Sequence, residues 1–367
     1  MRINFVLLWS TLGGGTKIIL RLANELSLRG HDVSLITVGT KRDLSWINFR
    51  GRVVRIPIPW SERLIRKYNA LFRRNPDFRR KFYIDMISVI SERIPECDIN
   101  VAAYGITAFS VFLSGKGNGF YYAQHYEPLT YTDHFFQKLA EASYLLPLKK
   151  IVNSTWLRDQ ISEHLGKDVS YADVVPSAVD TSIFTVKSSD EFIKRDGVFR
   201  VVCMGKVEKW KGFKEALDAM AIVFKNHSDD NIEFFVYSFR DNLLRNKDAP
   251  YTLITDIQGD RLAQLLSTAD VVIISSWYES SPLPGLEAMA CGAALVTTQF
   301  GVEDFAINNK NALIIPPKDP YLIADAIDRL FNDKGLRDYL VTNGFKTAAE
   351  FSWDKTVDRI EEIFKHA

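Results

Sequence analysis

Apolar runs and helical periodicity alternate through the first forty residues of the chain. Residues 3–9 form a continuous apolar run, which is typical of a buried parallel strand. Residues 16–29 carry apolar side chains at helical spacing, and Gly30 follows where a helix commonly ends. Residues 32–38 are apolar again. The pattern predicts a βαβ unit, which is the building block of a parallel sheet.

The same alternation continues along the chain and returns clearly in its second half. Strands are predicted at 99–103, 119–123, 150–153, 199–204, 232–237, 269–275 and 293–298, and helices at 213–224, 261–267 and 283–291. A final amphipathic helix is predicted at 354–367. Strands that alternate with helices in both halves predict an α/β protein of two doubly wound, Rossmann-like domains.

The chain length also favours two domains, because 367 residues exceed what one hydrophobic core usually serves. Regular patterning breaks at residues 171–184, around Pro176, Ser177 and Asp180. We therefore predict one domain over residues 1–175 and a second over 176–353.

Composition narrows the class of protein. Hydrophobic residues make up 47% and charged residues 25%, with a formal net charge of +1, so nothing points to a nucleic-acid partner. Cys97, Cys203 and Cys291 lack metal-ligand spacing and are predicted to be reduced structural thiols. The apolar runs are too short or too broken for a signal peptide or a membrane span, so we expect a cytoplasmic protein.

A basic segment interrupts this neutral pattern. Residues 61–81 hold eight Lys and Arg side chains against Glu62 and Asp77, with five apolar residues on one helical face. One interpretation is a solvated basic helix over the first domain. The other is contact, through residues 63–81, with anionic lipid or a phosphate-bearing acceptor, which would place the protein on the inner face of the membrane.

The strongest chemical signal lies in residues 277–292, which follow a predicted strand and open a helix. Ligands of open α/β sheets bind at the carboxyl ends of strands. The helix dipole and the free N–H groups at Leu283–Gly285 predict an anion site that suits a nucleotide diphosphate. Pro284 occupies a position whose N–H would be unpaired anyway. Glu279 and Glu287 are then predicted to accept hydrogen bonds from sugar and ribose hydroxyls.

A second signal lies in residues 204–212, which also follow a strand and precede a helix. Lys206 and Lys211 are predicted to neutralise charge on the diphosphate as the sugar departs, so that no metal is required. A lysine-rich surface loop is the alternative interpretation.

The first domain contributes two weaker signals. His125 is a candidate for the donor sugar or for proton transfer, although a lone histidine is more often structural, and Glu127 is a candidate base. Gly13, Gly14 and Gly15 allow close backbone approach to a ligand. Ile18 stands where a dinucleotide fingerprint needs a further glycine, which disfavours a nicotinamide dehydrogenase.

Together these segments resemble glycosyltransferase family 4, the retaining enzymes of the two-domain GT-B fold. The resemblance covers nearly the whole chain and includes residues 13–33, 153–157 and 175–180 besides the segments above. It implies that Glu279 faces the donor sugar, that Glu287 holds the ribose, that Lys211 binds phosphate and that His125 touches the sugar. Residues 124–128 also resemble a rhamnosyltransferase subgroup.

The family resemblance implies two Rossmann-like domains that face each other across a cleft, with the helix 354–367 packing back on the first domain. It implies hexosyl transfer with retention to a carbohydrate or lipid-linked acceptor, in polysaccharide or glycoconjugate synthesis, without a cofactor or metal. The expected donor contacts are Lys206, Lys211, Ser281, Leu283, Pro284, Gly285 and Glu287, and the expected acceptor side is Gly13–Gly15 and Glu127. Lys206, Pro282 and Ser177 depart from the family's usual arginine, glycine and asparagine, and these departures bear on donor identity.

Two other classes of function stay open on the sequence. An inverting transferase or an epimerase on the same fold would use Glu127 or His125 as a base. A non-catalytic module would bind sugar nucleotides or dock on a membrane without turning over a donor.

Overall fold

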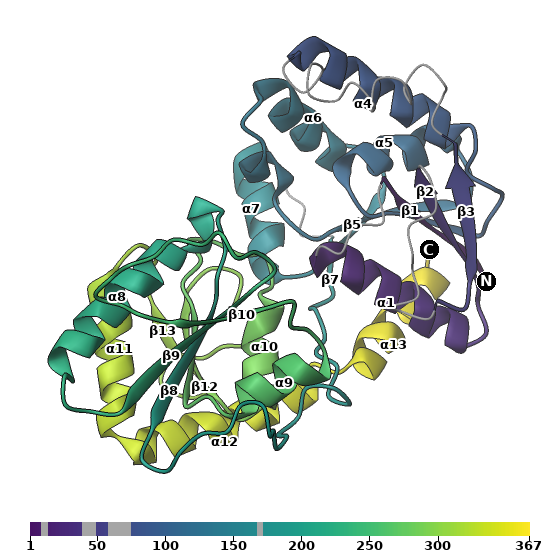
Figure 1. The fold of residues 1–367 in the computed structure, drawn as a ribbon. Helices are drawn as coiled ribbons and strands as arrows, with labels where there is room; N and C mark the ends of the chain where they lie inside the picture. The colour runs from purple at the N-terminus through teal and green to yellow at the C-terminus, as the bar shows by residue number, and fades with distance from the viewer. Residues whose placement is uncertain (9–13, 39–48, 58–74, 167–171) are drawn as a thin grey trace. The chain divides into compact units, whose positions relative to one another are not determined.

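The computed structural model describes residues 1–8, 14–38, 49–57, 75–166 and 172–367, which form two compact units (Figure 1). The first unit comprises Met1–Val175 together with Val357–Ala367, and the second comprises Pro176–Thr356. Each unit contains one parallel sheet covered by helices. Both units are therefore Rossmann-like, as the alternating pattern predicts.

The first unit contains a seven-stranded sheet in the order β3-β2-β1-β4-β5-β6-β7. Its strands are β1 (Arg2–Leu7), β2 (Asp32–Val38), β3 (Arg52–Ile56), β4 (Ile99–Ala102), β5 (Asn118–Ala123), β6 (Lys149–Val152) and β7 (Asp173–Val174). Its helices are α1 (Gly14–Leu28), α4 (Pro76–Ser91), α5 (Gly105–Ser114), the 3-10 turn η2 (Glu127–Thr130), α6 (His134–Tyr144) and α7 (Thr155–Leu165). Successive strands are added on one side of β1 up to β3 and on its other side from β4 onward, so the topological switch point lies between β1 and β4.

The last helix, α13 (Trp353–Lys365), joins the two units in sequence, and its residues from Val357 onward pack on the first unit. Its buried side chains face the sheet, and Phe364 meets Phe120 of β5 with ring centroids 5.0 Å apart. On the polar side, His31 Nε2 lies 2.9 Å from Glu361 Oε1. In Figure 1, α1 and α13 cover one face of this sheet, while α4 and α6 lie over the other.

The second unit contains a six-stranded sheet in the order β10-β9-β8-β11-β12-β13. Its strands are β8 (Phe199–Met204), β9 (Ile232–Ser238), β10 (Thr252–Thr255), β11 (Val271–Ile274), β12 (Ala294–Thr298) and β13 (Leu313–Ile315). Its helices are the 3-10 turn η3 (Lys209–Lys211), α8 (Phe213–Asn226), α9 (Asp260–Ser267), α10 (Leu283–Ala290), α11 (Pro320–Asn332) and α12 (Lys334–Glu350). This is the strand order of a dinucleotide-type Rossmann domain, with its switch point between β8 and β11.

Two hydrophobic cores cover the two faces of this second sheet. Val202 of β8 belongs to the core that α9 and α10 complete, whereas its neighbours Val201 and Cys203 belong to the core completed by α8 and α11. Successive residues of a strand point to opposite faces, so a strand buried on both faces needs apolar side chains throughout. This requirement explains the continuous apolar runs in the sequence.

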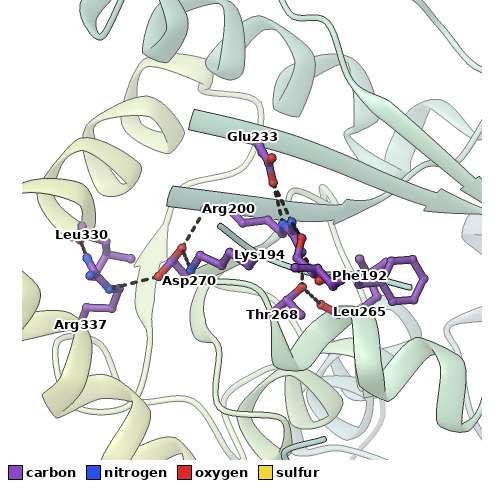
Figure 2. Close-up of polar contacts among 10 residues, drawn as sticks. Phe192, Lys194, Arg200, Glu233, Leu265, Thr268, Asp270, Leu330 and Arg337 are labelled. Atoms are coloured by element: carbon purple, nitrogen blue, oxygen red, sulfur yellow. Dashed lines mark hydrogen bonds and ion pairs between the residues drawn. The ribbon is translucent and has the colours of Figure 1, made fainter. Parts of the chain in front are cut away.

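A buried arginine ties the amino-terminal edge of the second sheet together (Figure 2). Arg200 of β8 is only 1% exposed, and its guanidinium donates to Glu233, to Thr268 Oγ1 and to the carbonyl oxygens of Phe192 and Ile193. The Arg200 N–H donates to Asp270, which also pairs with Lys194. The network anchors the segment before β8 to the base of the sheet, at the edge opposite to the carboxyl ends of the strands.

The structure bears on two sequence-based expectations for the first unit, the glycine segment and the basic segment. Gly14 and Gly15, which precede the helix predicted at residues 16–29, already belong to helix α1, while Gly13 lies outside the described residues. Much of the basic segment, including residues 63–74, also lies outside them. In the described part, Arg79 and Arg80 both pair with Asp133, and Lys81 pairs with Asp85, so these three cations have protein partners.

All three cysteines are buried free thiols, as predicted. Within the described parts of the chain, no helix combines the length and apolar character that crossing a bilayer requires.

Candidate functional site

The two loops with the strongest sequence signals meet at the switch point of the second sheet. Strands β8 and β11 are hydrogen-bonded neighbours in parallel register, so their carboxyl ends lie at the same edge. The loop with Lys206 and Lys211 follows β8, and the loop with Glu279 follows β11. Ligands of doubly wound sheets bind at this position. Topology therefore brings together two segments that lie about seventy residues apart in the sequence.

Backbone contacts hold these two loops in register. Trp277 N–H donates to the Trp210 carbonyl at 2.7 Å, and Ser275 Oγ donates to the Gly212 carbonyl at 2.7 Å. Gly212 has a φ of +66°, and a Cβ on it would lie 1.8 Å from the Ser275 carbonyl oxygen. Only glycine fits a position that combines a left-handed backbone with such close approach. Gly212 therefore lets η3 dock directly on the end of β11.

The loop after β12 is packed against the same place. Thr298 Oγ1 donates to the Ser276 carbonyl at 2.6 Å. Gly301 has a φ of +80°, and a Cβ there would lie 2.2 Å from the Glu279 carbonyl oxygen. Three consecutive strand ends thus fix the backbone around Glu279, which gives a rigid support for its side chain.

Lys211 and Glu279 are brought into direct contact. The Lys211 ammonium bonds to Glu279 Oε1, and Ser276 Oγ donates to the same oxygen at 2.7 Å. Both side chains are largely but not fully buried, at 23% and 15% exposed. Because this ion pair lies at a partly open strand edge, a ligand with the same charge as one partner can replace that partner. An anionic ligand would compete with Glu279 for Lys211.

Lys206 adds a second cation to the same loop. Burial, followed by the charge of Lys211, lowers the pKa of Lys206. Its ammonium lies 5.2 Å from the centroid of the Phe239 ring. Two ammonium groups that repel each other in this way make a site that favours an anion.

The start of helix α10 offers fewer backbone donors than the sequence suggested. Pro282 is the N-cap residue, Pro284 has no N–H, and Gly285 N–H donates to the Pro282 carbonyl at 3.0 Å. Among the residues of the expected Leu283–Gly285 anion site, the N–H of Leu283 is therefore the principal donor left for a ligand. Ser281, half-buried, stands one residue before the N-cap. The dipole of an eight-residue helix still favours an anion here.

Glu287 lies on α10, one turn beyond its start, and is partly exposed. Burial raises the pKa of Tyr237, near the end of β9, and the negative charge of Glu287 raises it further. Glu279, Glu287, Lys206 and Lys211 are therefore all positioned by the carboxyl edge of one sheet.

Sequence reasoning overlooked the aromatic residues of these loops. Trp210 of η3 stacks on Tyr278, with ring centroids 5.0 Å apart and planes 7° apart. The signal was available, because Trp210 precedes Lys211 directly and Trp277 and Tyr278 are the two residues before Glu279 in the sequence.

In the first unit, His125 follows the end of β5 in a loop that is fixed by its backbone. Tyr144 Oη donates to the His125 carbonyl at 2.8 Å, and Asn153 Nδ2 donates to the Gln124 carbonyl at 3.0 Å. A Cβ on Gly15 would lie 3.2 Å from Gln124 Oε1, so the start of α1 and the His125 loop are close neighbours. The structure thus groups Gly14, Gly15 and His125 at the carboxyl edge of the first sheet.

Glu127 differs from the expectation of an acceptor-facing base, because its side chain is directed into the protein interior. It is 9% exposed, and its Oε1 accepts hydrogen bonds from Gly105 N–H at 2.8 Å and from Tyr121 Oη at 2.9 Å. Burial raises the pKa of Glu127, and these donors partly oppose the effect. In this position the carboxyl group links the His125 loop to the start of α5.

Glu127→Gln should therefore become more stable relative to the wild type as the pH rises. Below the unfolded pKa, near 4.5, Glu127 is protonated in both the folded and the unfolded state, and the wild type has its full stability. As the pH rises through the raised folded pKa, the unfolded state releases its proton more readily, and the wild type loses stability. Glutamine keeps the accepting oxygen but does not titrate. Urea unfolding at about pH 5 and about pH 8 measures the difference. Glu163→Gln, on the exposed face of α7, is the control, and a pH-independent difference for Glu127→Gln would contradict this account.

A family of known sequences matches the second unit of the chain. Residues 198–333 match the family described as Glycosyl transferases group 1. The matched segment runs from β8 to the end of α11 and includes all four charged residues of the switch-point site.

Curated relatives cover part of the chain. It is 30% identical over 177 residues to an uncharacterized glycosyltransferase of Methanocaldococcus jannaschii, covering 46% of this chain and 45% of that protein. It is 26% identical over 232 residues to a D-inositol 3-phosphate glycosyltransferase of Paenarthrobacter aurescens, covering 59% of this chain and 57% of that protein. The chain thus spans about half the length of the curated relatives it matches.

Solved structures match over the full length. Anabaena HepE in complex with UDP-glucose has a TM-score of 0.74 at 14% identity and covers all of both chains. WaaG, a glycosyltransferase involved in lipopolysaccharide biosynthesis, has a TM-score of 0.70 at 12% identity with the same coverage. The chain has the GT-B fold. At these identities the likeness establishes the fold, while the family match rests on residues 198–333.

The described residues also bear on metal binding. Across those ranges, no group of three or more His, Cys, Asp or Glu side chains is arranged to hold a metal ion.

Proposed function

We propose that this chain is a glycosyltransferase that moves a sugar, with retention, from a nucleotide-diphosphate donor to a carbohydrate or lipid-linked acceptor. The observation that carries the proposal is the contact between Lys211 and Glu279 at the switch point of the second sheet. A carboxylate and a displaceable ammonium at this edge suit a sugar hydroxyl and a diphosphate, respectively. The match of residues 198–333 to group 1 glycosyl transferases supports the same activity.

In the proposed reaction, the bond from the anomeric carbon to the diphosphate oxygen breaks as the acceptor oxygen attacks from the same face. The departing phosphate oxygen takes the acceptor proton, which accounts for retention without a protein base. Lys206, Lys211 and the amino terminus of α10, at Leu283–Gly285 and next to Ser281, stabilise the negative charge that develops on the leaving diphosphate. The charge is met by these protein groups, so we propose that the reaction needs no metal or cofactor.

The remaining residues take the roles that the family resemblance implies. Glu279 accepts from a hydroxyl of the donor sugar, and Glu287 accepts from the ribose. His125 is the residue of the first unit that we assign to the donor sugar, and we place the acceptor near Gly14 and Gly15. Glu127 supports the His125 loop from the interior, in keeping with its hydrogen bonds to Gly105 and Tyr121.

The wider biological setting is part of the proposal. A hexosyl donor, a role in polysaccharide or glycoconjugate synthesis and a cytoplasmic location, at the inner face of the membrane, fit the resemblance to family 4. Membrane contact through residues 63–81 stays a prediction, since residues 63–74 lie outside the described part of the chain.

UDP, GDP and ADP should be compared as ligands by thermal shift and calorimetry, because a ligand that binds only the folded protein raises its apparent stability. We expect one of them to bind, and Glu287→Ala to weaken that binding about tenfold or more through loss of the charge-assisted ribose contact. Lys214→Ala, on the neighbouring helix α8, is the control.

The anomeric configuration of the product, read by NMR, separates retention from inversion. Binding without any turnover of the corresponding sugar nucleotides would favour a non-catalytic binding module, and the absence of nucleotide binding would contradict the proposed function.

A further inference from the structure

An aromatic cluster lies around the proposed donor site and has no role in the reaction as described so far. Trp210 belongs to η3, and Trp277 and Tyr278 belong to the loop after β11. All three side chains are partly buried at the carboxyl edge of the second sheet. We call these three residues the aromatic cluster.

The Trp210 indole contacts both an aromatic ring and a cation. Tyr278 stacks on it with centroids 5.0 Å apart and planes nearly parallel, at 7°. The Lys211 ammonium lies 4.0 Å from the Trp210 centroid. The Trp210 indole therefore contacts both the Tyr278 ring and the Lys211 ammonium, and the cation faces the quadrupole of the indole.

Trp277 also contacts cations. The ammonium groups of Lys318 and Lys209 lie 4.4 Å and 5.5 Å from its ring centroid, and its Nε1 donates to Glu215 Oε1 at 2.9 Å. Aromatic rings at a sugar-binding site often stack on the sugar. Here the indoles of Trp210 and Trp277 carry ammonium groups, so their geometry favours a role in placing lysines.

Lys211 consequently has two different kinds of partner. Glu279 compensates its charge through an ion pair, while Trp210 attracts the ammonium without removing its net charge. An incoming diphosphate competes only with the carboxylate, because an anion cannot replace the indole. The indole can remain under the lysine while the ammonium changes from one anionic partner to the other.

We propose that Trp210 is a positioning residue for the donor site, which places the Lys211 ammonium for transfer from Glu279 to the donor diphosphate. This inference rests on the proposed function. Trp210 acts through Lys211 and need not touch the donor itself. Tyr278 supports it by fixing the plane of the indole, and the loop backbones stay joined independently through the bond from Trp277 N–H to the Trp210 carbonyl.

A double-mutant cycle tests this assignment. Trp210→Leu and Trp210→Phe are made in the wild-type chain and in the Lys211→Met chain, and affinity is measured by calorimetry for whichever of UDP, GDP or ADP binds the wild type most tightly. Trp210→Leu should weaken binding about fivefold to tenfold, and Trp210→Phe, which keeps an aromatic face, about twofold. In the Lys211→Met background, Trp210→Leu should have no further effect, since the cation it places is already gone.

The outcomes separate the inference from the proposed function. An equal loss from Trp210→Leu in both backgrounds would show that the indole only maintains loop structure, and no loss in the wild type would equally overturn the inference. In either case the wild type still binds the nucleotide, so the proposed function would stand. If the wild type binds none of the three diphosphates, the proposed function fails and the positioning role fails with it. Unfolding midpoints of all variants, measured without nucleotide, establish that the second unit remains folded.

Discussion

Lys211→Met should lower the rate of sugar transfer by about 100-fold or more while the protein stays folded. The ammonium is expected to stabilise charge that grows on the diphosphate only as the bond to the sugar breaks, so its loss should reduce kcat more than it raises KM. Methionine preserves an unbranched side chain that can still lie on Trp210. Initial rates with the best sugar nucleotide, together with an unfolding midpoint, measure both effects.

Lys214→Met provides a matched control for this substitution. Lys214 stands three residues further on, at the exposed start of α8, and forms an ion pair with Asp218. The same charge is lost a short distance from the site, so a general effect of net charge would appear in both variants. A Lys211→Met enzyme that kept the wild-type rate would remove Lys211 from the mechanism and leave the Lys211–Glu279 pair as a structural contact.

The sequence allowed prediction of both loops of the donor site because each follows an apolar strand. Residues 199–204 coincide with β8, and residues 269–275 contain β11. Strand ends are the positions at which ligands of open α/β sheets bind, so Lys211 and Glu279 were identifiable as candidates. Their contact follows from the strand order, which places β8 beside β11, and local periodicity carries no information on that order.

Long-range contacts account for what the sequence did not reveal. Glu127 follows a strand end like the other candidates, yet its side chain turns inward to Gly105 and Tyr121. The stack of Trp210 on Tyr278 joins residues 68 positions apart, a separation the sequence alone cannot bridge. Short-range patterns predict which segments carry chemistry, whereas side-chain direction depends on neighbours that only the folded chain supplies.

Arg200 is the clearest case of such a hidden role, and Arg200→Met should destabilise the second unit by about 3 kcal/mol or more. The sequence shows only an arginine in an apolar strand. In the structure the guanidinium is buried and donates to Glu233, Thr268 and two backbone carbonyls (Figure 2). Methionine fills part of the volume but leaves these acceptors without their donor. Buried acceptors that lack a hydrogen bond lower the free energy of unfolding.

Arg195→Met is the matched control, because Arg195 also approaches Glu233, at 3.9 Å, but its side chain is 83% exposed. An exposed pair of this kind contributes about 0.5 kcal/mol or less. Urea unfolding can be followed by tryptophan fluorescence, in which Trp210, Trp277 and Trp353 report the second unit, while the other tryptophans of the chain lie within residues 1–175. Equal effects of the two substitutions would contradict the role of the buried network.

Arg200→Lys should give an intermediate loss, since an ammonium keeps the charge but cannot reproduce the planar set of donors. Because Arg200 lies at the amino-terminal edge of the sheet, opposite to the carboxyl ends that carry the proposed donor site, nucleotide affinity of the folded protein should be unchanged in all three variants.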